Sequence, residues 1–346
     1  MTNTMRAVVL YKPHDLRIEE RPIPTISADE VLVRVRTVGV CGSDVHYWHL
    51  GRIGPVVVEA PLILGHECAG ELIEVGANVA HLHIGDRVAL EPGVPCGRCG
   101  FCRAGQYNLC PDVVFFATPP VDGAFCEYVA HSADFTFKLP EGVTFEQGAM
   151  CEPLSVGIHA VRRAGIGLGD SVLITGAGTI GLMTLMAARA AGATTTVITD
   201  VRPNRLELAR ELGATAAADV RSEDALALVQ GLTRGRGVDK VIECTGVSSA
   251  MLTGLEALKR GGTAVWVGMT DDAYTIPAVN TIRKELDIRG IFRYRNTYPT
   301  ALGLIAAGSV DVARLITHHL SLDRLPEAME IAHTGRDGAV KVMVEV

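Results

Sequence analysis

The sequence lacks a long apolar run, a run of Lys or Arg, and an apolar stretch at its N-terminus. The formal net charge of -7 argues against nucleic acid or anionic membranes as main partners. The most apolar region, residues 181–199, is broken by Arg189 and Gly192 and is interpreted as a helix and a strand, not a membrane span. Residues 1–6 lack the features of a signal peptide, so we expect a cytoplasmic protein.

Internal repeats and low-complexity segments are absent as well. The length of 346 residues and the 48% hydrophobic content allow two domains, each with a core. The first 150 residues predict a compact, barrel-like β domain because apolar and polar residues alternate in short runs bounded by glycine and proline. Strands are expected at 6–11, 30–40, 71–75 and 87–90.

From about residue 156, buried apolar strands alternate with helical patterns, which predicts a parallel, doubly wound sheet. The expected strands are 171–175, 195–200, 216–220, 240–244, 263–267 and 286–291. The expected helices are 182–191, 204–212 and 223–232, with another between the strands at 240–244 and 263–267. A helix at 323–332 and a strand at 340–346 follow, and the strand can rejoin the first domain.

A G-x-G-x-x-G turn at Gly176–Gly181 lies between an expected strand and an expected helix. The glycines permit close approach of the backbone, and the free N–H groups of the helix N-terminus suit a pyrophosphate. Asp200 ends the next strand, where a carboxylate binds ribose hydroxyls and repels a 2′-phosphate, which favours NAD over NADP. Arg202 and Arg205 lie nearby and weaken this preference. A glycine-rich turn without a ligand is the alternative.

Four of the nine cysteines lie within 15 residues, spaced C-x2-C-x2-C-x7-C. This spacing predicts a tetrahedral zinc site with no open position, hence a structural zinc, with an iron–sulfur cluster as the alternative. The ligands are Cys96, Cys99, Cys102 and Cys110. Four other cysteines are interpreted as small buried hydrophobic residues. They are Cys68, Cys126, Cys151 and Cys244. Of these, Cys151 could also compete with its neighbour Glu152 for a metal.

A second set of metal-binding side chains is scattered along the chain: Cys41, His66, Glu67 and Glu152. A thiolate, an imidazole and carboxylates form a plausible zinc site with room for water or substrate, provided that the fold brings them together. We therefore expect a catalytic zinc here.

These motifs resemble the zinc-dependent medium-chain dehydrogenases, most closely the polyol (sorbitol/xylitol) dehydrogenases. Beyond the glycine turn and the four cysteines, the resemblance is carried by residues 40–48, 65–67, 115–123, 152–157 and 292–297. It implies a GroES-like β-barrel catalytic domain at 1–155 and 296–346, and a Rossmann domain at 156–295. It further implies a homo-oligomer, commonly a tetramer, with two zinc ions per chain.

The resemblance also implies roles for single residues. It places the catalytic zinc on Cys41, His66 and Glu67, and Glu152 binds either the zinc or its water. Ser43 and His46 are candidates for carrying away the substrate proton, and Glu152 or its water is the other candidate. We expect Asp44 to orient His66 through its far ring nitrogen. The expected substrate pocket comprises Tyr47, Phe116, Glu152, Arg293 and Tyr294. The expected cofactor contacts are Gly176, Gly178, Ile180, Gly181, Asp200, Arg205, Thr245, Val267, Gly268, Met269, Phe292 and Arg293.

Two further histidine features are interpreted as structural. His159 is expected on a helix after Glu152, and His318-His319 is not expected to be a ligand pair, because adjacent side chains diverge.

The expected activity is the reversible, NAD-linked oxidation of a secondary hydroxyl of a polyol to the ketose. A related zinc dehydrogenase for another secondary alcohol, of the threonine or butanediol type, is the first alternative. A non-catalytic protein that binds NAD and zinc is the second.

Overall fold

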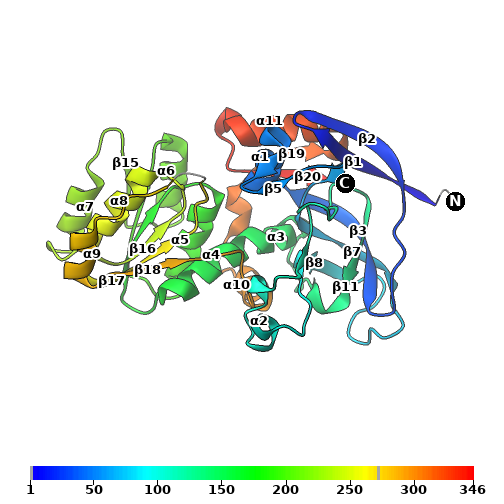
Figure 1. Ribbon diagram of the computed structural model, residues 1–346, viewed down its shortest axis with the longest axis horizontal. Helices are drawn as coiled ribbons and strands as arrows, with labels where there is room; N and C mark the ends of the chain where they lie inside the picture. Colours follow the sequence, from blue (N-terminus) through cyan, green and yellow to red (C-terminus); the bar gives the residue numbers. More distant parts are fainter. Residues whose placement is uncertain (1–2, 271–272) are drawn as a thin grey trace. The chain divides into compact units, whose positions relative to one another are not determined.

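The computed structural model describes residues 3–270 and 273–346 and divides into two compact units (Figure 1). Unit 1 comprises Met1–Glu152, Tyr298–Gly308 and Val312–Val346, and unit 2 comprises Pro153–Thr297 and Ser309–Asp311. The boundaries expected from the sequence, 155/156 and 295/296, compare with observed boundaries at 152/153 and 297/298.

Unit 1 is built on a seven-stranded sheet of order β12-β8-β7-β3-β20-β19, with β11 also paired to β3. A three-stranded sheet, β2-β1-β6, accompanies it. The strands are β1 (Thr4–Lys12), β2 (Asp15–Pro22), β3 (Glu30–Gly39), β4 (Arg52–Ile53), β5 (Val56–Val57), β6 (Leu62–Ile63), β7 (Glu67–Val75), β8 (Arg87–Leu90), β9 (Gly93–Val94), β10 (Val114–Phe115), β11 (Tyr128–Ser132), β12 (Thr136–Lys138), β19 (Ile316–Ser321) and β20 (Lys341–Glu345).

Strand β3 shows the predicted alternation, because Val31, Val33 and Val35 are buried while Arg34 is exposed. The terminal strand β20 pairs antiparallel with β3, which confirms that the end of the chain rejoins the first domain. The pairing brings residues some 300 positions apart in sequence side by side.

Several helices of unit 1 gave no clear sequence pattern. They are α1 (Gly42–Leu50), α2 (Gly100–Arg103), α3 (Phe145–Ala149) and α10 (Tyr298–Ala306). All are short, so few turns display a 3.6-residue apolar period. The predicted helix at the end of the chain is α11 (Leu325–Thr334), and α4 (Cys151–Ala164) begins in unit 1 and continues in unit 2.

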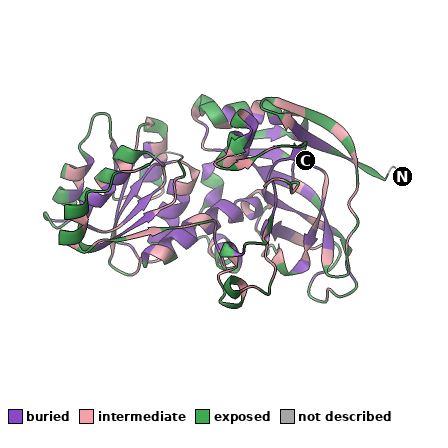
Figure 2. Ribbon diagram, in the orientation of Figure 1, coloured by how far each residue is buried: buried purple, intermediate pink, exposed green. Residues whose placement is uncertain are grey.

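Unit 2 contains a six-stranded sheet of order β15-β14-β13-β16-β17-β18, in which all neighbours are parallel. The strands are β13 (Ser171–Thr175), β14 (Thr195–Asp200), β15 (Ala216–Asp219), β16 (Val238–Glu243), β17 (Leu258–Trp266) and β18 (Asp287–Gly290). The helices are α5 (Thr179–Ala190), α6 (Pro203–Glu211), α7 (Ala225–Leu232), α8 (Ser248–Ala257) and α9 (Ala278–Lys284). This is the strand order of the Rossmann fold, with its switch point between β13 and β16. Figure 2 shows the strands largely buried and the helices with exposed outer faces.

One local expectation needs correction: α5 begins at Thr179, inside the predicted turn, and not at residue 182. Gly178 is the N-cap of the helix, and Gly181 lies in its first turn. A Cβ atom at Gly181 would stand 1.8 Å from the carbonyl oxygen of Gly176, so only glycine permits this contact. The pattern of apolar residues becomes visible only after the glycines, which explains the late predicted start.

Among the described residues, no helix combines the length and apolar character needed to cross a lipid bilayer.

Candidate metal and cofactor sites

Cys41 is the N-cap residue of α1, with extended backbone dihedrals. Its own N–H donates to Asp44 Oδ2 at 3.0 Å, which completes a capping box. Asp44 Oδ1 accepts a second hydrogen bond from the N–H of Gly65 at 2.9 Å. A single buried carboxylate therefore joins the start of α1 to the segment that precedes His66. The N-cap position also places the Cys41 sulfur at the positive end of the helix dipole.

Cys41, His66 and Glu67 come together: one ligand atom from each lies within 4.8 Å of the others. His66 and Glu67 are buried, and Asp44 Oδ1 lies 3.5 Å from Nδ1 of His66, the residue it was expected to orient. Burial lowers the pKa of His66, but the charges of Asp44 and Cys41 outweigh it and hold this pKa well above its usual value. Such a concentration of negative charge around an imidazole suits a bound cation.

Glu67 has a buried cationic partner that the sequence patterns did not reveal. Nζ of Lys341, on β20, forms an ion pair with Glu67 Oε2 and donates a hydrogen bond to the carbonyl of Val40 at 3.0 Å. The charges of Glu67 and Cys41 outweigh burial and raise the pKa of Lys341. Space for the carboxylate comes from Gly39, where a Cβ atom would stand 2.1 Å from Glu67 Oε2.

Glu152 is buried at the start of α4, but among the described residues the 4.8 Å cluster contains only the other three predicted ligands. A position outside the cluster fits the water-holding role better than direct ligation. The neighbouring thiol of Cys151 donates to the carbonyl oxygen of Tyr298 at 3.8 Å and is fully buried. The donor set of Cys41, His66 and Glu67 fits zinc, because all three are zinc ligands and three ligands leave a position open.

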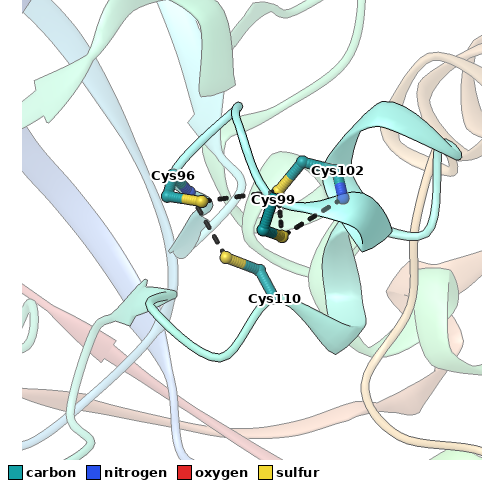
Figure 3. Close-up of side chains that lie close together, drawn as sticks. All are labelled: Cys96, Cys99, Cys102 and Cys110. Atoms are coloured by element: carbon teal, nitrogen blue, oxygen red, sulfur yellow. Dashed lines mark hydrogen bonds between the residues drawn. The ribbon is translucent and has the colours of Figure 1, made fainter.

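The four clustered cysteines lie with their sulfur atoms within 4.8 Å of one another (Figure 3). Cys99 Sγ lies 3.4 Å from Cys102 Sγ, and Cys96 Sγ lies 4.0 Å from Cys102 Sγ. Backbone N–H groups lower the pKa of Cys96 to about 7, whereas burial and the neighbouring thiols raise that of Cys102 to about 12. Four sulfur atoms this close fit a closed tetrahedral metal site, in which all four would bind as thiolates.

The same lobe is tied to the sheet by a buried carboxyl group. Tyr107, between the third and fourth cysteines, donates its hydroxyl to Glu91 Oε1 at 2.7 Å. Burial raises the pKa of Glu91 to about 7, and the charge of Glu152 contributes in the same direction. Glu91 follows β8 directly, so the lobe is anchored to the strand that the buried Tyr298 also contacts through the carbonyl of Leu90.

The glycine turn has the shape that a dinucleotide requires. A Cβ atom at Gly178 would meet only the Arg205 guanidinium, at 3.7 Å, so the backbone at the N-terminus of α5 is open on that side. Asp200 Oδ2 accepts a hydrogen bond from the N–H of Ala177 at 2.6 Å. Asp200 Oδ1 accepts two more from the backbone, including the N–H of Val201 at 2.7 Å. The acid thus holds the turn as well as ending β14.

The other predicted cofactor residues of unit 2 follow neighbouring strands. Thr245 comes after β16, and Val267, Gly268 and Met269 come after β17. A buried acid joins these loops: Glu243 Oε1 accepts the N–H of Thr245 at 2.6 Å, and its backbone oxygen accepts the N–H of Val267 at 2.8 Å. They lie at the carboxyl ends of the strands, the edge at which Rossmann folds bind ligands. Glu243 carried no sequence signal beyond its place at a strand end.

The predicted substrate residues divide between the units. Tyr47, on α1, and Phe116 belong to unit 1, and both are buried. Arg293 and Tyr294 belong to unit 2, where Arg293 has a positive φ of 52° and its guanidinium lies 4.7 Å from the ring centre of Phe292. A non-glycine residue in the left-handed region is strained, and such strain concentrates at functional sites.

Ser43 and His46 lie on α1, three residues apart and therefore on the same face of the helix. His159 is buried on α4, and burial lowers its pKa to about 4. The two adjacent histidines of β19 have different partners: His318 contacts Thr317 Oγ1 at 3.0 Å, and Nδ1 of His319 lies 2.8 Å from Oε1 of Glu146.

Comparison with known proteins identifies the family. Residues 27–141 match the family model of the alcohol dehydrogenase GroES-like domain, and residues 179–307 match that of zinc-binding dehydrogenases. The chain is 48% identical to a sorbitol dehydrogenase of Gallus gallus, over 98% of this chain and 96% of the relative. The chain belongs to the zinc-dependent medium-chain dehydrogenases. This dehydrogenase is an oxidoreductase that acts on a CH–OH group, and it uses zinc and a nicotinamide cofactor.

Further comparisons support the same family. The dehydrogenase is 46% identical to a sorbitol dehydrogenase of Bacillus subtilis (strain 168), over 99% of both chains. Its structure is similar to that of 2R,3R-butanediol dehydrogenase from Bacillus subtilis, with a TM-score of 0.90 and 33% identity over 99% of both chains. It is also similar to a zinc-binding dehydrogenase from Sinorhizobium meliloti 1021 bound to NADP, with a TM-score of 0.91 and 34% identity over 99% of both chains.

Proposed function

We propose that this dehydrogenase reversibly oxidises a secondary hydroxyl of a polyol, of the xylitol, sorbitol or L-iditol type, to the ketose with NAD. The identity of 46–48% to sorbitol dehydrogenases over nearly the whole chain carries the proposal. A second candidate, oxidation of a 2,3-butanediol-type alcohol, is favoured by the likeness to butanediol dehydrogenase, at the lower identity of 33%.

The metal sites proposed for the enzyme hold one catalytic and one structural zinc per chain. Cys41, His66 and Glu67 would hold the catalytic ion, with Glu152 acting through water. When bound, this zinc would lower the pKa of the substrate hydroxyl, and NAD would accept the hydride. Ser43 and His46 share one face of α1, and there they can pass the hydroxyl proton outward.

NAD is proposed over NADP because Asp200 ends β14 beside the glycine turn, where its charge opposes a 2′-phosphate. Arg205 lies close to the same turn and weakens the opposition. Measuring kcat/KM with both cofactors at equal concentration tests the choice, and a higher value with NADP would refute it. We further propose a homotetramer located in the cytoplasm, with the assembly measurable by light scattering.

The test of the activity is absorbance at 340 nm with NAD and sorbitol, xylitol, threonine or 2,3-butanediol, with and without a chelator. We expect NADH from at least one of the two polyols, at a kcat/KM above that for either other alcohol, and loss of turnover with chelator. A higher kcat/KM for 2,3-butanediol would favour the second candidate.

Two variants test the assigned residues. Glu152→Gln should keep its zinc, by metal analysis, yet lose turnover, because the amide cannot serve as a base. Loss of zinc would instead indicate direct ligation.

Arg293→Ala should reduce kcat/KM for polyols far more than for simple secondary alcohols, because its donors would bind the additional hydroxyls. Equal losses on both substrates would contradict this role.

A further inference from the structure

Three histidines that take no part in the proposed catalysis meet at one place in unit 1. His14 lies in the turn between β1 and β2, His49 in the last turn of α1, and His333 in the last turn of α11. They are separated by up to 319 positions in sequence (333 minus 14), so only the fold brings them together. His14 and His333 are exposed and His49 is half-buried, which leaves the group open to solvent.

Two of the ring nitrogens share a hydrogen bond, and an ion bound between them would replace its proton. Nε2 of His14 lies 3.0 Å from Nδ1 of His49. Two nitrogens that bind one zinc-sized ion at 2.0–2.1 Å lie about 3 Å apart, so this separation suits adjacent ligands. The ring of His333 lies 4.3 Å from that of His49, centre to centre, at an interplanar angle of 31°. Among the described residues these three histidines do not form a group with all ligand atoms within 4.8 Å, so the exposed His333 has to rotate about its side-chain bonds to bring a third nitrogen to the same ion.

Local contacts hold the backbone around the histidines. The N–H of His14 donates to the carbonyl of Trp48 at 2.8 Å, and His14 has a positive φ of 62°. The ring of Pro13 packs against Gly51, where a Cβ atom would stand 3.1 Å from Pro13 Cγ. Trp48 is buried beneath the group, with its ring centre 4.4 Å from that of His14. A turn of fixed conformation that packs on the buried Trp48 ring loses less entropy when a ligand binds.

The local field also favours a cation. Both α1 and α11 end at this place, each with a left-handed glycine cap, Gly51 and Gly335. The C-terminus of a helix carries partial negative charge, and two such ends act on the same small region. Imidazole nitrogens suit zinc, copper and nickel.

We propose that His14, His49 and His333 form a surface site for a borderline divalent transition ion, such as Zn²⁺, Ni²⁺ or Cu²⁺, separate from the two proposed zinc sites. Water molecules complete the coordination on the exposed side. The ion links the β1–β2 turn to the ends of α1 and α11, and therefore stabilises unit 1 without entering the reaction. The proposal does not depend on the substrate of the enzyme.

The test uses the fluorescence of Trp48, one of only two tryptophans in the chain. In the Trp266→Phe variant, Trp48 is the remaining tryptophan, and its ring lies beside the histidines. The full chain, loaded with zinc and freed of excess metal, is titrated with Ni²⁺, a quencher of indole fluorescence. We expect saturable quenching with one Ni²⁺ per chain, reversed by excess imidazole.

Three substitutions in this background assign the ligands. His14→Asn tolerates the positive φ, and His49→Gln and His333→Ala remove the other two rings. Loss of a nitrogen ligand should raise the Ni²⁺ dissociation constant at least about tenfold in each variant. His83→Ala removes an exposed histidine elsewhere in unit 1 and should leave the constant unchanged. Quenching that does not saturate, or a dissociation constant unaffected by His14→Asn and His49→Gln, would overturn the proposal.

Discussion

At the scale of single residues, the buried pair of Lys341 and Glu67 is the most consequential contact of the candidate metal site. Two opposite charges that are buried away from water stabilise each other, and removing one leaves the other buried without its partner. The pair also ties Oε2 of Glu67 to Lys341 on β20.

We predict that Lys341→Met destabilises the protein by about 3 kcal/mol, because the buried Glu67 then loses the cationic partner of its Oε2. Urea unfolding of the zinc-free protein measures the effect. In the double variant Glu67→Gln/Lys341→Met both charges are gone, so its loss should be smaller than the sum of the two single losses. Strictly additive losses would show that the two side chains do not interact.

His131 gives a second prediction at this scale. It is buried, and its Nε2 lies 2.9 Å from the carbonyl oxygen of Glu91. Burial lowers the pKa of His131 to about 4, whereas an unfolded histidine titrates near 6.5. Between these values the unfolded chain binds the additional proton. The stability that the neutral ring contributes is therefore complete above pH 6.5 and is lost as the pH falls toward 4.

Lowering the pH from 7.5 to 5.0 should thus reduce the free energy of unfolding of the wild type by about 2 kcal/mol more than that of His131→Gln. The neutral amide can still donate to Glu91 but does not titrate. Urea unfolding at both pH values, on zinc-loaded proteins, provides the comparison. Parallel pH dependences in the two proteins would mean that His131 does not contribute.

At the scale of elements, the four-cysteine lobe has little secondary structure of its own to hold its shape. The only helix between the first and fourth cysteines, besides a single 3-10 turn, is the four-residue α2, which cannot be stable alone. Its cap is Cys99, whose sulfur accepts the N–H of Cys102 at 3.4 Å. A ligand of the proposed zinc is therefore also the start of the helix.

We predict that Cys102→Ser reduces the zinc content from about two ions per chain to about one, and opens the lobe to proteolysis. Metal analysis and limited trypsin digestion test this, since Arg98 and Arg103 lie inside the lobe. Cys244→Ala, in the other unit, should keep both ions and resist trypsin at these sites. A lobe that stays protected after losing its metal would contradict the prediction.

At the scale of the whole molecule, the chain carries its two kinds of ligand site in different units. Both cysteine-containing clusters belong to unit 1, and the glycine turn belongs to unit 2. Ligands that bind only the folded state stabilise it by mass action, by about 2.7 kcal/mol at a concentration of 100 times Kd.

Calorimetry should therefore resolve two ligand effects. A chelator should lower the melting temperature of unit 1, and NADH should raise that of unit 2. Gly181→Val provides the matched control: its side chain would overlap the carbonyl of Gly176, so the NADH effect should disappear while the chelator effect remains. NADH protection that survives in this variant would place the cofactor elsewhere.

The sequence by itself determined the features that depend on neighbouring residues. Three such features are local patterns: the strand alternation of 30–40, the spacing of the four cysteines and the glycine turn. The structure has β3, α2 and the start of α5 at these places. Their chemistry is fixed by intervals of two to eight residues, which a linear pattern records. The start of α5 was misplaced because glycines carry no apolar period.

Tertiary structure alone decided which distant residues meet. Cys41, His66 and Glu67 form a cluster because β3 and β7 pair and α1 follows β3, and Lys341 joins them because β20 adds to the same sheet. Glu152, chosen from the same sequence motifs, lies outside the cluster. No local pattern distinguishes these outcomes, because sheet pairing depends on the burial of whole faces and on the closure of long loops.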